Sequence, residues 1–301
     1  MPRLLELDDL DPTRLARILD RAVGWKAEPG AVPGALAGRA VAALFEKPSA
    51  RTRISVEVAV ATLGGHPVYI RGEEVGLDTR ESVEDVARTI AGMCGLIAAR
   101  VFDHGVLERM AAVSTVPVVN LLSDQAHPCQ ALADLLTIRE HFGDLAGRRV
   151  AFVGDGNNVA ASLAFAAALS GIELVVASPD GYRLDDAVVD RARNLGGVVD
   201  VTGDPFEAVR GADAIYTDVW TSMGQEAEQE HRRVAFAGFA VDETLLGAAP
   251  DTAVFMHCLP AHRGEEVSAA VIDGPRSLVW SQAANRMHSV RALLCELLEV
   301  V

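Results

Sequence analysis

Side chains suited to phosphate binding follow a short apolar run near the N-terminus. The run 41–45 predicts a buried strand, and 49–63 predicts a helix that ends at two glycines. A helix N-terminus offers free N–H groups, to which hydroxyls and arginines add further donors for a phosphate. The alternative is an ordinary helix cap with two solvated arginines. The residues of this candidate site are Ser49, Arg51, Thr52 and Arg53.

Two further polar positions also follow predicted strands. Arg100 ends the apolar run 96–99, where a charge is costly unless it has a partner or reaches solvent. His127 and Gln130 come after the run 116–122 and open a predicted helix, so both could donate to a carbonyl oxygen. The alternative is a loop histidine with local partners. A metal site of His127 and Cys129 is disfavoured because no further ligands lie at useful spacing.

A glycine-rich turn follows the predicted strand 150–153. Its sequence Gly-Asp-Gly-Asn-Asn-Val imitates a dinucleotide fingerprint, but the sixth position is Val159 instead of Gly or Ala. Asp180, after the next strand, is a possible ribose partner, so an NAD-dependent dehydrogenase is an alternative function. The two asparagines, 157 and 158, instead favour a zwitterionic ligand.

Three positions in the second half of the chain complete the candidates. Asp218 follows the run 214–217 and could bind an ammonium group or cap a helix. Cys258, in His-Cys-Leu-Pro, could be a nucleophile, an orienting thiol or a core residue. Arg286 follows Asn285 at the predicted start of the C-terminal helix, where arginines are usually solvated.

Strand and helix patterns alternate along the whole chain, which predicts an α/β fold with parallel sheets and helices on both faces. Ligands of such sheets bind beyond the carboxyl ends of the strands, where the candidate residues stand. A break near residue 145 predicts two doubly wound parallel-sheet domains, linked by the long helix 128–142 and by a returning C-terminal helix. The predicted segments are 1–142, 143–284 and 285–301.

Composition narrows the function classes. The chain has 301 residues, with 42 acidic and 27 basic ones and a net charge of −15, which disfavours nucleic acid as a partner. Four scattered cysteines fit a reducing cytoplasm, and neither a signal peptide nor an apolar run long enough for a membrane span is found. A net charge describes the whole surface, so a small phosphate in a locally basic pocket remains possible.

Together, the motifs resemble one family. Ser-x-Arg-Thr-Arg, the strand-end Arg100 and His-Pro-Cys-Gln are similar to carbamoyltransferases, and the resemblance covers about residues 45–286. Asp-x-Trp-x-Ser-Met-Gly and His-Cys-Leu-Pro are similar to the branch that uses ornithine. The resemblance implies transfer of the carbamoyl group from carbamoyl phosphate to the δ-amine of L-ornithine, giving citrulline, in arginine biosynthesis. It implies no metal and no organic cofactor.

The resemblance also implies a role for each matching residue. The carbamoyl-phosphate side would comprise Ser49, Ala50 through its N–H, Arg51, Thr52, Arg100, His127, Gln130, Cys258, Leu259 and Arg286. The ornithine side would comprise Asn158, Asp218, Ser222, Met223 and Cys258. Arg51, Arg100, His127, Asp218 and Cys258 would be the catalytic residues, with Cys258 orienting and not nucleophilic. The proton acceptor could be Asp218, Cys258 or the substrate phosphate.

Two positions depart from the family pattern. Relatives often have Thr at the position of Ala50, and a glutamine donated by a neighbouring subunit is absent near Gly76, where Arg80 could substitute. The family is usually a homotrimer, so the resemblance implies a homotrimer or a multiple of trimers for this chain. Three alternatives stay open: a carbamoyltransferase for putrescine or an N-acylated ornithine, the dehydrogenase, and a non-catalytic binding protein.

Overall fold

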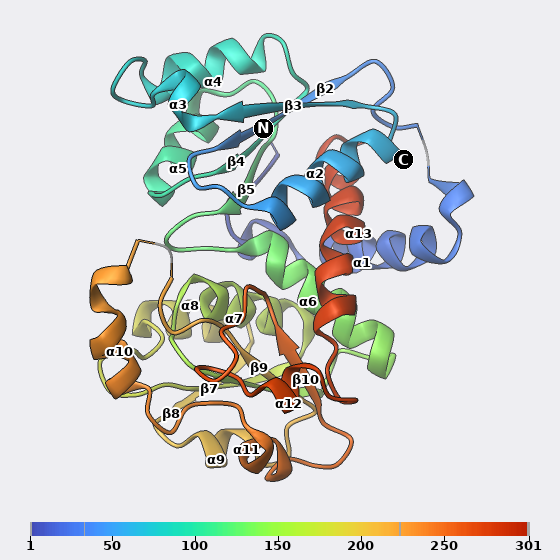
Figure 1. The fold of residues 1–301 in the computed structure, drawn as a ribbon. Helices are drawn as coiled ribbons and strands as arrows, with labels where there is room; N and C mark the ends of the chain where they lie inside the picture. Colours follow the sequence, from blue (N-terminus) through green and yellow to red (C-terminus); the bar gives the residue numbers. More distant parts are fainter. Residues whose placement is uncertain (1, 33, 223, 300–301) are drawn as a thin grey trace. The chain divides into compact units, whose positions relative to one another are not determined.

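The computed structural model describes residues 2–32, 34–222 and 224–299, which form two compact units (Figure 1). Unit 1 comprises residues 1–136 and 284–301, and unit 2 comprises residues 137–283. Each unit is built around its own five-stranded parallel sheet. The predicted α/β class with two parallel sheets is therefore confirmed. The functional domain boundaries at 142 and 284 stay predictions.

The sheet of unit 1 has the order β1-β5-β4-β2-β3, and all its strand pairs are parallel. The first long strand, β2, lies between β4 and β3, and the chain continues first to β3 on one side and then to β4 on the other. The carboxyl ends of β2 and β4 thus flank the point where strand order reverses, which is a typical ligand position. The strands are β1 (Arg3–Leu4), β2 (Ala40–Phe45), β3 (His66–Arg71), β4 (Leu96–Arg100) and β5 (Val118–Leu122).

The helices of unit 1 begin where the sequence offers caps. Asp11, Ser49 and Ser82 each accept a hydrogen bond from the first turn of the helix that follows. One face of the sheet packs on α4 and α5 through buried aliphatic side chains. The helices are α1 (Pro12–Ala27), α2 (Ala50–Thr62), α3 (Gly72–Val75), α4 (Val83–Ala91) and α5 (His104–Val113), with short 3₁₀ turns at Leu7–Asp9 and Pro29–Ala31.

The sheet of unit 2 repeats this plan with the order β10-β9-β6-β7-β8. Here β6 is central, and strand order reverses between β6 and β9. Alternate residues of the strands face a core formed with α9 and α11, while α7 and α8 lie on the other face (Figure 1). The strands are β6 (Arg149–Val153), β7 (Glu173–Ala177), β8 (Val198–Thr202), β9 (Ala214–Thr217) and β10 (Val254–His257).

The helices of unit 2 are α7 (Asn158–Ser170), α8 (Asp186–Asn194), α9 (Pro205–Val209), α10 (Gln229–Ala235), α11 (Glu243–Gly247) and α12 (Ala269–Ile272), with a 3₁₀ turn at Glu226–Glu228. Asn157, Asp185 and Asp204 cap α7, α8 and α9. Two helices, α6 (Pro128–Phe142) and α13 (Val279–Leu297), contribute residues to both units. In the described part of the chain, no helix is long and apolar enough to cross a membrane.

The predicted start of the C-terminal helix at Asn285 is wrong. Helix α13 begins at Val279, whose N–H donates to the Ser277 hydroxyl, 3.5 Å away. Asn285 is instead fully buried within the helix, and its Oδ1 accepts a hydrogen bond from Nζ of Lys26 at 2.7 Å. Asn285 thus belongs to a residue type that often begins helices, but here it forms a buried contact inside one.

Candidate active site

The first turn of α2 presents hydroxyl and N–H donors beyond the end of β2. The Ser49 hydroxyl donates to Oγ1 of Thr52 at 3.0 Å and accepts the Thr52 N–H at 3.4 Å. Ala50 and Arg51 are exposed on the same turn, whereas Thr52 is buried. The turn therefore offers free backbone N–H groups and one accessible guanidinium to an anion.

Arg100 and His127 are buried beside this turn. Arg100 ends β4, and its carbonyl accepts the N–H of Glu46, the residue that follows β2, at 2.9 Å. Both side chains are about 5% exposed, so Arg100 is not the solvated strand-end arginine of the alternative prediction. Burial, reinforced by the positive charges of Arg286 and Arg100, holds the pKa of His127 well below its usual value. The imidazole is therefore neutral at pH 7 and can act as a hydrogen-bond donor without a charge.

Arg286 joins the same cluster from α13. Its Nη1 donates to Oε1 of Gln130 at 2.6 Å, and its Nη2 donates to Oγ1 of Thr52 at 2.9 Å. Only 4% of Arg286 is exposed, so the alternative of a solvated helix-start arginine does not hold. Residues from α2, α6 and α13 thus converge, although they lie far apart in the sequence.

Arg53 does not join the cluster. Its Nε donates to Oε1 of Glu57 at 2.8 Å, and its guanidinium lies over the ring of Tyr69 at 3.9 Å from the ring centre. Lys47, by contrast, lies over the Phe102 ring, and burial together with the charge of Arg100 lowers the pKa of Lys47. The sequence pattern therefore predicted Arg53 for the phosphate site, whereas the structure pairs it with Glu57 and Tyr69.

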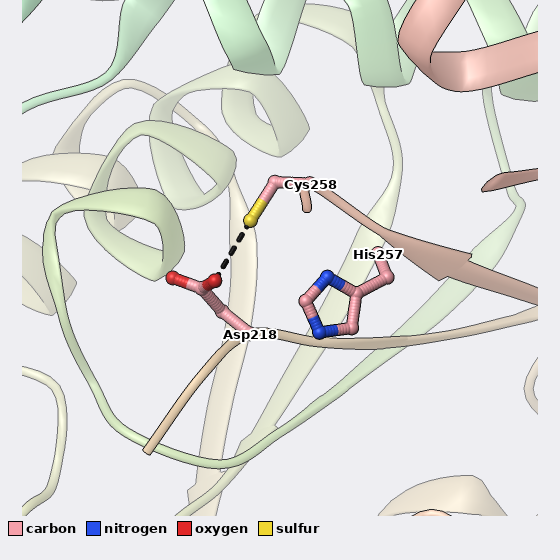
Figure 2. Close-up of side chains that lie close together, drawn as sticks. All are labelled: Asp218, His257 and Cys258. Atoms are coloured by element: carbon pink, nitrogen blue, oxygen red, sulfur yellow. Dashed lines mark hydrogen bonds between the residues drawn. The ribbon is translucent and has the colours of Figure 1, made fainter. Parts of the chain in front are cut away.

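The second group of candidate residues lies at the carboxyl ends of β6, β9 and β10 in unit 2. The Cys258 thiol donates to Oδ1 of Asp218 at 2.8 Å (Figure 2), while Nδ2 of Asn157 donates to the other oxygen at 2.8 Å. Asp218 is 6% exposed. A buried carboxylate with two donors is a suitable partner for a ligand ammonium group.

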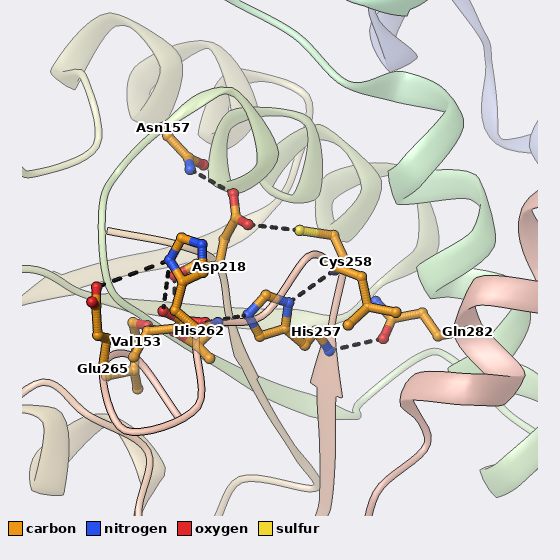
Figure 3. Close-up of polar contacts among 11 residues, drawn as sticks. Val153, Asn157, Asp218, His257, Cys258, His262, Glu265 and Gln282 are labelled. Atoms are coloured by element: carbon orange, nitrogen blue, oxygen red, sulfur yellow. Dashed lines mark hydrogen bonds and ion pairs between the residues drawn. The ribbon is translucent and has the colours of Figure 1, made fainter. Parts of the chain in front are cut away.

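A further set of contacts fixes the loop that carries Cys258 (Figure 3). Nδ1 of His257 accepts the N–H of Leu259 at 2.9 Å, so the ring proton is on Nε2, which donates to Oε1 of Glu266 at 3.2 Å. The His257 N–H donates to Oε1 of Gln282 at 2.8 Å. Leu259 has a positive φ of 59° and is followed by a cis proline peptide. The loop conformation is thus defined by side chains on both of its ends.

The remaining ornithine-side candidates flank this group. Asn158 is half-buried at the first position of α7, and the Ser222 N–H donates to Oε1 of Gln225 at 3.1 Å. Arg232 anchors the segment between Asp218 and Ser222 because it donates to the Trp220 carbonyl at 3.0 Å and to Asp155 at 2.8 Å. Met223 lies outside the described residues.

Groups that could ligate a metal already serve other contacts. Asp218, His257 and Cys258 offer ligand atoms within 4.8 Å of one another, as do His262, Glu265 and Glu266. Both ring nitrogens of His257 and the Cys258 thiol are used in the hydrogen bonds given above. In the first group, a metal would therefore have to displace the hydrogen bonds of His257 and Cys258.

The glycine-rich turn after β6 has a structural explanation that needs no dinucleotide. A Cβ at Gly156 would collide with the backbone of Arg183 and Leu184. Asp180, the possible ribose partner, instead pairs with Arg183 at 2.7 Å and is largely exposed. The contacts of Gly156 and Asp180 disfavour the dehydrogenase alternative.

Cys129, part of the disfavoured metal site, is buried and donates to the Asn120 carbonyl at 3.4 Å.

Several residues of the two groups were not predicted. Asn157 was predicted only as one of two asparagines suited to a zwitterionic ligand, whereas it caps α7 and donates to Asp218. His257, Glu266, Gln282 and Asp134 support the candidates without belonging to a predicted set. Asp134 is four residues after Gln130 on α6, a helical spacing that could have identified it.

Comparison with known proteins identifies the family. Residues 3–140 match the carbamoyl-P binding domain, and residues 146–297 the Asp/Orn binding domain, of aspartate/ornithine carbamoyltransferase. The chain belongs to the aspartate/ornithine carbamoyltransferase family. Family membership agrees with the resemblance of the motifs and with both parallel sheets.

Individual members of this family are similar over almost their whole length. An ornithine carbamoyltransferase of Acidothermus cellulolyticus is 52% identical over 296 residues, covering 97% of this chain and 95% of the relative. An anabolic ornithine carbamoyltransferase of Pyrococcus furiosus is 48% identical, covering 97% and 94%. A solved structure of ornithine carbamoyltransferase from Pyrococcus furiosus superposes with a TM-score of 0.95 at 46% identity, covering 99% of this chain and 97% of that one.

Proposed function

We propose that this chain transfers the carbamoyl group of carbamoyl phosphate to the δ-amine of L-ornithine, which gives L-citrulline and phosphate. The observation that supports ornithine most directly is the buried Asp218 carboxylate with Asn157 and Cys258 as donors. Such a carboxylate favours a ligand with a free α-ammonium group. Putrescine lacks the α-carboxylate that Asn158 and Ser222 would bind, and N-acylation would remove the ammonium charge.

In this proposal, Ser49, Ala50, Arg51 and Thr52 bind the phosphate through the first turn of α2, together with Arg100 and Arg286. His127 and Gln130 donate to the carbamoyl oxygen, and neutral His127 is suited to that role because it adds no charge before the reaction. Asn158, Asp218, Ser222 and Met223 bind the amino-acid end of ornithine. Cys258 and Leu259 contact the carbamoyl group and the attacking amine.

The reaction needs no covalent enzyme intermediate. The neutral δ-amine attacks the carbamoyl carbon, negative charge develops on the carbamoyl oxygen, and the C–O bond to phosphate breaks. Arg51 and Arg100 stabilise the departing phosphate, while positioning of both substrates supplies much of the rate. Asp218, Cys258 and the leaving phosphate are the groups available to accept the amine proton.

The direction proposed is arginine biosynthesis, since the Pyrococcus furiosus relative is named anabolic. The location proposed is the cytoplasm, whose reducing conditions suit four scattered cysteines. We also propose a homotrimer, which light scattering of the purified protein would test by its mass.

Purified protein and carbamoyl phosphate, offered with ornithine, N-acetylornithine, putrescine and aspartate in parallel, test the proposed substrate. We expect phosphate release and citrulline formation to be fastest with ornithine. A higher kcat/KM with any other acceptor would contradict the assignment. An Arg51→Ala sample in each reaction corrects for spontaneous breakdown of carbamoyl phosphate.

A further inference from the structure

Both ends of the Gln130 side-chain amide form hydrogen bonds inside one cluster. We call it the phosphate-side cluster, and its other members are Thr52, Arg100, His127 and Arg286. Its Oε1 accepts a hydrogen bond from Nη1 of Arg286 at 2.6 Å, and its Nε2 donates to Oδ1 of Asp134 at 2.8 Å. Arg286 then continues to Oγ1 of Thr52 at 2.9 Å. A single chain of hydrogen bonds therefore joins Asp134 to the first turn of α2.

This chain permits one orientation of the Gln130 amide. If the amide turned by half a rotation, its oxygen would face the Asp134 oxygen and its NH₂ would face the Arg286 guanidinium. An acceptor would then face an acceptor, and a donor would face a donor. Asp134 and Arg286 together thus select the orientation in which the second Nε2–H remains available to a ligand.

Asp134 also contributes charge to the cluster. Its side chain is fully buried, and Arg100 and Arg286 bring two buried cations to the same part of unit 1. His127 adds none, because its pKa is held well below neutral. The Asp134 carboxylate therefore offsets part of the positive charge before a phosphate arrives, and it lowers the attraction for a phosphate that has to leave.

We propose that Asp134 is a positioning residue for the carbamoyl-transfer reaction. It orients the Gln130 amide toward the carbamoyl oxygen and weakens the hold of the cluster on the product phosphate. This inference rests on the proposed function, and it assigns Asp134 no direct contact with substrate.

The uncharged and nearly isosteric Asp134→Asn variant separates these two effects. We expect kcat/KM for carbamoyl phosphate to fall at least tenfold, because an asparagine amide can donate as well as accept and so no longer disfavours the turned Gln130. We expect the Kd of inorganic phosphate, measured by calorimetry, to tighten at least threefold, because a negative charge has been removed. Loosened packing would weaken both quantities together, so that result would overturn the proposal.

A double-mutant cycle tests whether Asp134 acts through Gln130. In the Gln130→Ala background, Asp134→Asn should change kcat/KM by less than twofold while phosphate binding still tightens. If both substitutions lower kcat/KM independently, the positioning role is wrong. Should Asp134→Asn fail to fold, the smaller and equally uncharged Asp134→Ser replaces it with the same expectations.

Asp144→Asn, at an exposed aspartate, is the matched control and should alter neither quantity more than twofold. Failure of the proposed function is distinguishable, since it would appear as absence of turnover with ornithine in the unmodified protein. The calorimetric measurement of phosphate binding uses no acceptor. It therefore tests the effect of Asp134 on phosphate even if ornithine is not the substrate.

Discussion

The Cys258 thiol and the Asp218 carboxylate meet because their strands are in register. His257 of β10 pairs with Thr217 of β9, so the residue after each strand end lies beside the other, with 2.8 Å between Sγ and Oδ1. The Thr217 hydroxyl also donates to the Val153 carbonyl of β6 at 2.6 Å. A parallel register thus brings together two functional groups that are 40 positions apart.

Cys258→Ala should lower kcat about tenfold or more, since hydrogen bonds to charged groups contribute about 1.5–3 kcal/mol. Cys258→Ser retains a donor for Asp218 and should keep more activity than the alanine variant. Steady-state kinetics with both substrates give the measurement, and Cys94→Ser, which changes a cysteine remote from Asp218 in the sequence, is the control. A Cys258→Ala kcat within twofold of the unmodified protein would show that the thiol is dispensable.

Arg51→Ala should abolish turnover while the fold stays intact, because an accessible guanidinium is lost from the first turn of α2. Arg53→Ala is the matched control, since Arg53 pairs with Glu57 and lies over Tyr69. We expect the control to retain most of its activity. If Arg51→Ala keeps activity within about tenfold, a loss of under about 1.4 kcal/mol, Arg51 does not bind the phosphate.

Buried His127 should make the protein less stable in mild acid. Its pKa is about 6.5 when unfolded and well below that when folded, so between these values the unfolded chain binds more protons. The free energy of unfolding should therefore fall as the pH drops below about 6.5, by up to about 1.4 kcal/mol per pH unit from this group.

Denaturant titrations from pH 5 to pH 8, in buffers without phosphate, measure that slope for the unmodified protein and for His127→Asn. The variant should show a smaller slope below pH 6.5. Equal slopes would mean that His127 is protonated in the folded protein as readily as in the unfolded chain.

Glu296 should stabilise unit 1, because Arg14, Arg17 and Arg21 of α1 all donate to its carboxylate. Burial alone would raise its pKa, but the hydrogen bonds from Arg17 and Arg14 outweigh burial and lower it. Glu296→Gln should reduce the free energy of unfolding at pH 7 by about 1–3 kcal/mol. This stabilisation is complete above the unfolded pKa of 4.5 and is lost as the pH falls through the lower folded value.

Glu57→Gln provides the comparison, since Glu57 forms a more exposed pair with Arg53 and should contribute under about 1 kcal/mol. Urea unfolding of the three proteins at pH 7 and pH 4 gives the measurement. A Glu296→Gln effect that is as small as that of Glu57→Gln, or that grows in acid, would contradict the assigned role.

Local signals in the sequence were sufficient for the elements and for many of the candidate residues. Caps at Asp11, Ser49 and Ser82 and the polar residues after β4 and β9 depend on neighbours in the chain, so pattern analysis could locate them. The start of α13 could not be located in this way. Asn285 is of a residue type that often caps helices, but its side chain instead accepts a buried hydrogen bond from Lys26.

Partnerships between distant segments could not be predicted from any pattern. Arg53 and Arg286 were both predicted near the start of a helix, yet Arg53 pairs with Glu57 on its own helix while Arg286 reaches Thr52 and Gln130. Register and topology decide between these outcomes. For the same reason, the bond from Asn157 to Asp218 could not be predicted, because it depends on the adjacency of β6 and β9.

The division of unit 1 into two chain segments has a consequence for the order of folding during synthesis. Unit 2 is continuous from Thr137 to Ala283, so a ribosome finishes it before the residues from Ala284 onward exist. Unit 1 has to wait, without Arg286 against Thr52 and without Glu296 against α1, until those last residues emerge. The domain translated first is therefore the one completed last, and a nascent chain lacking its final helix carries no finished phosphate-side cluster.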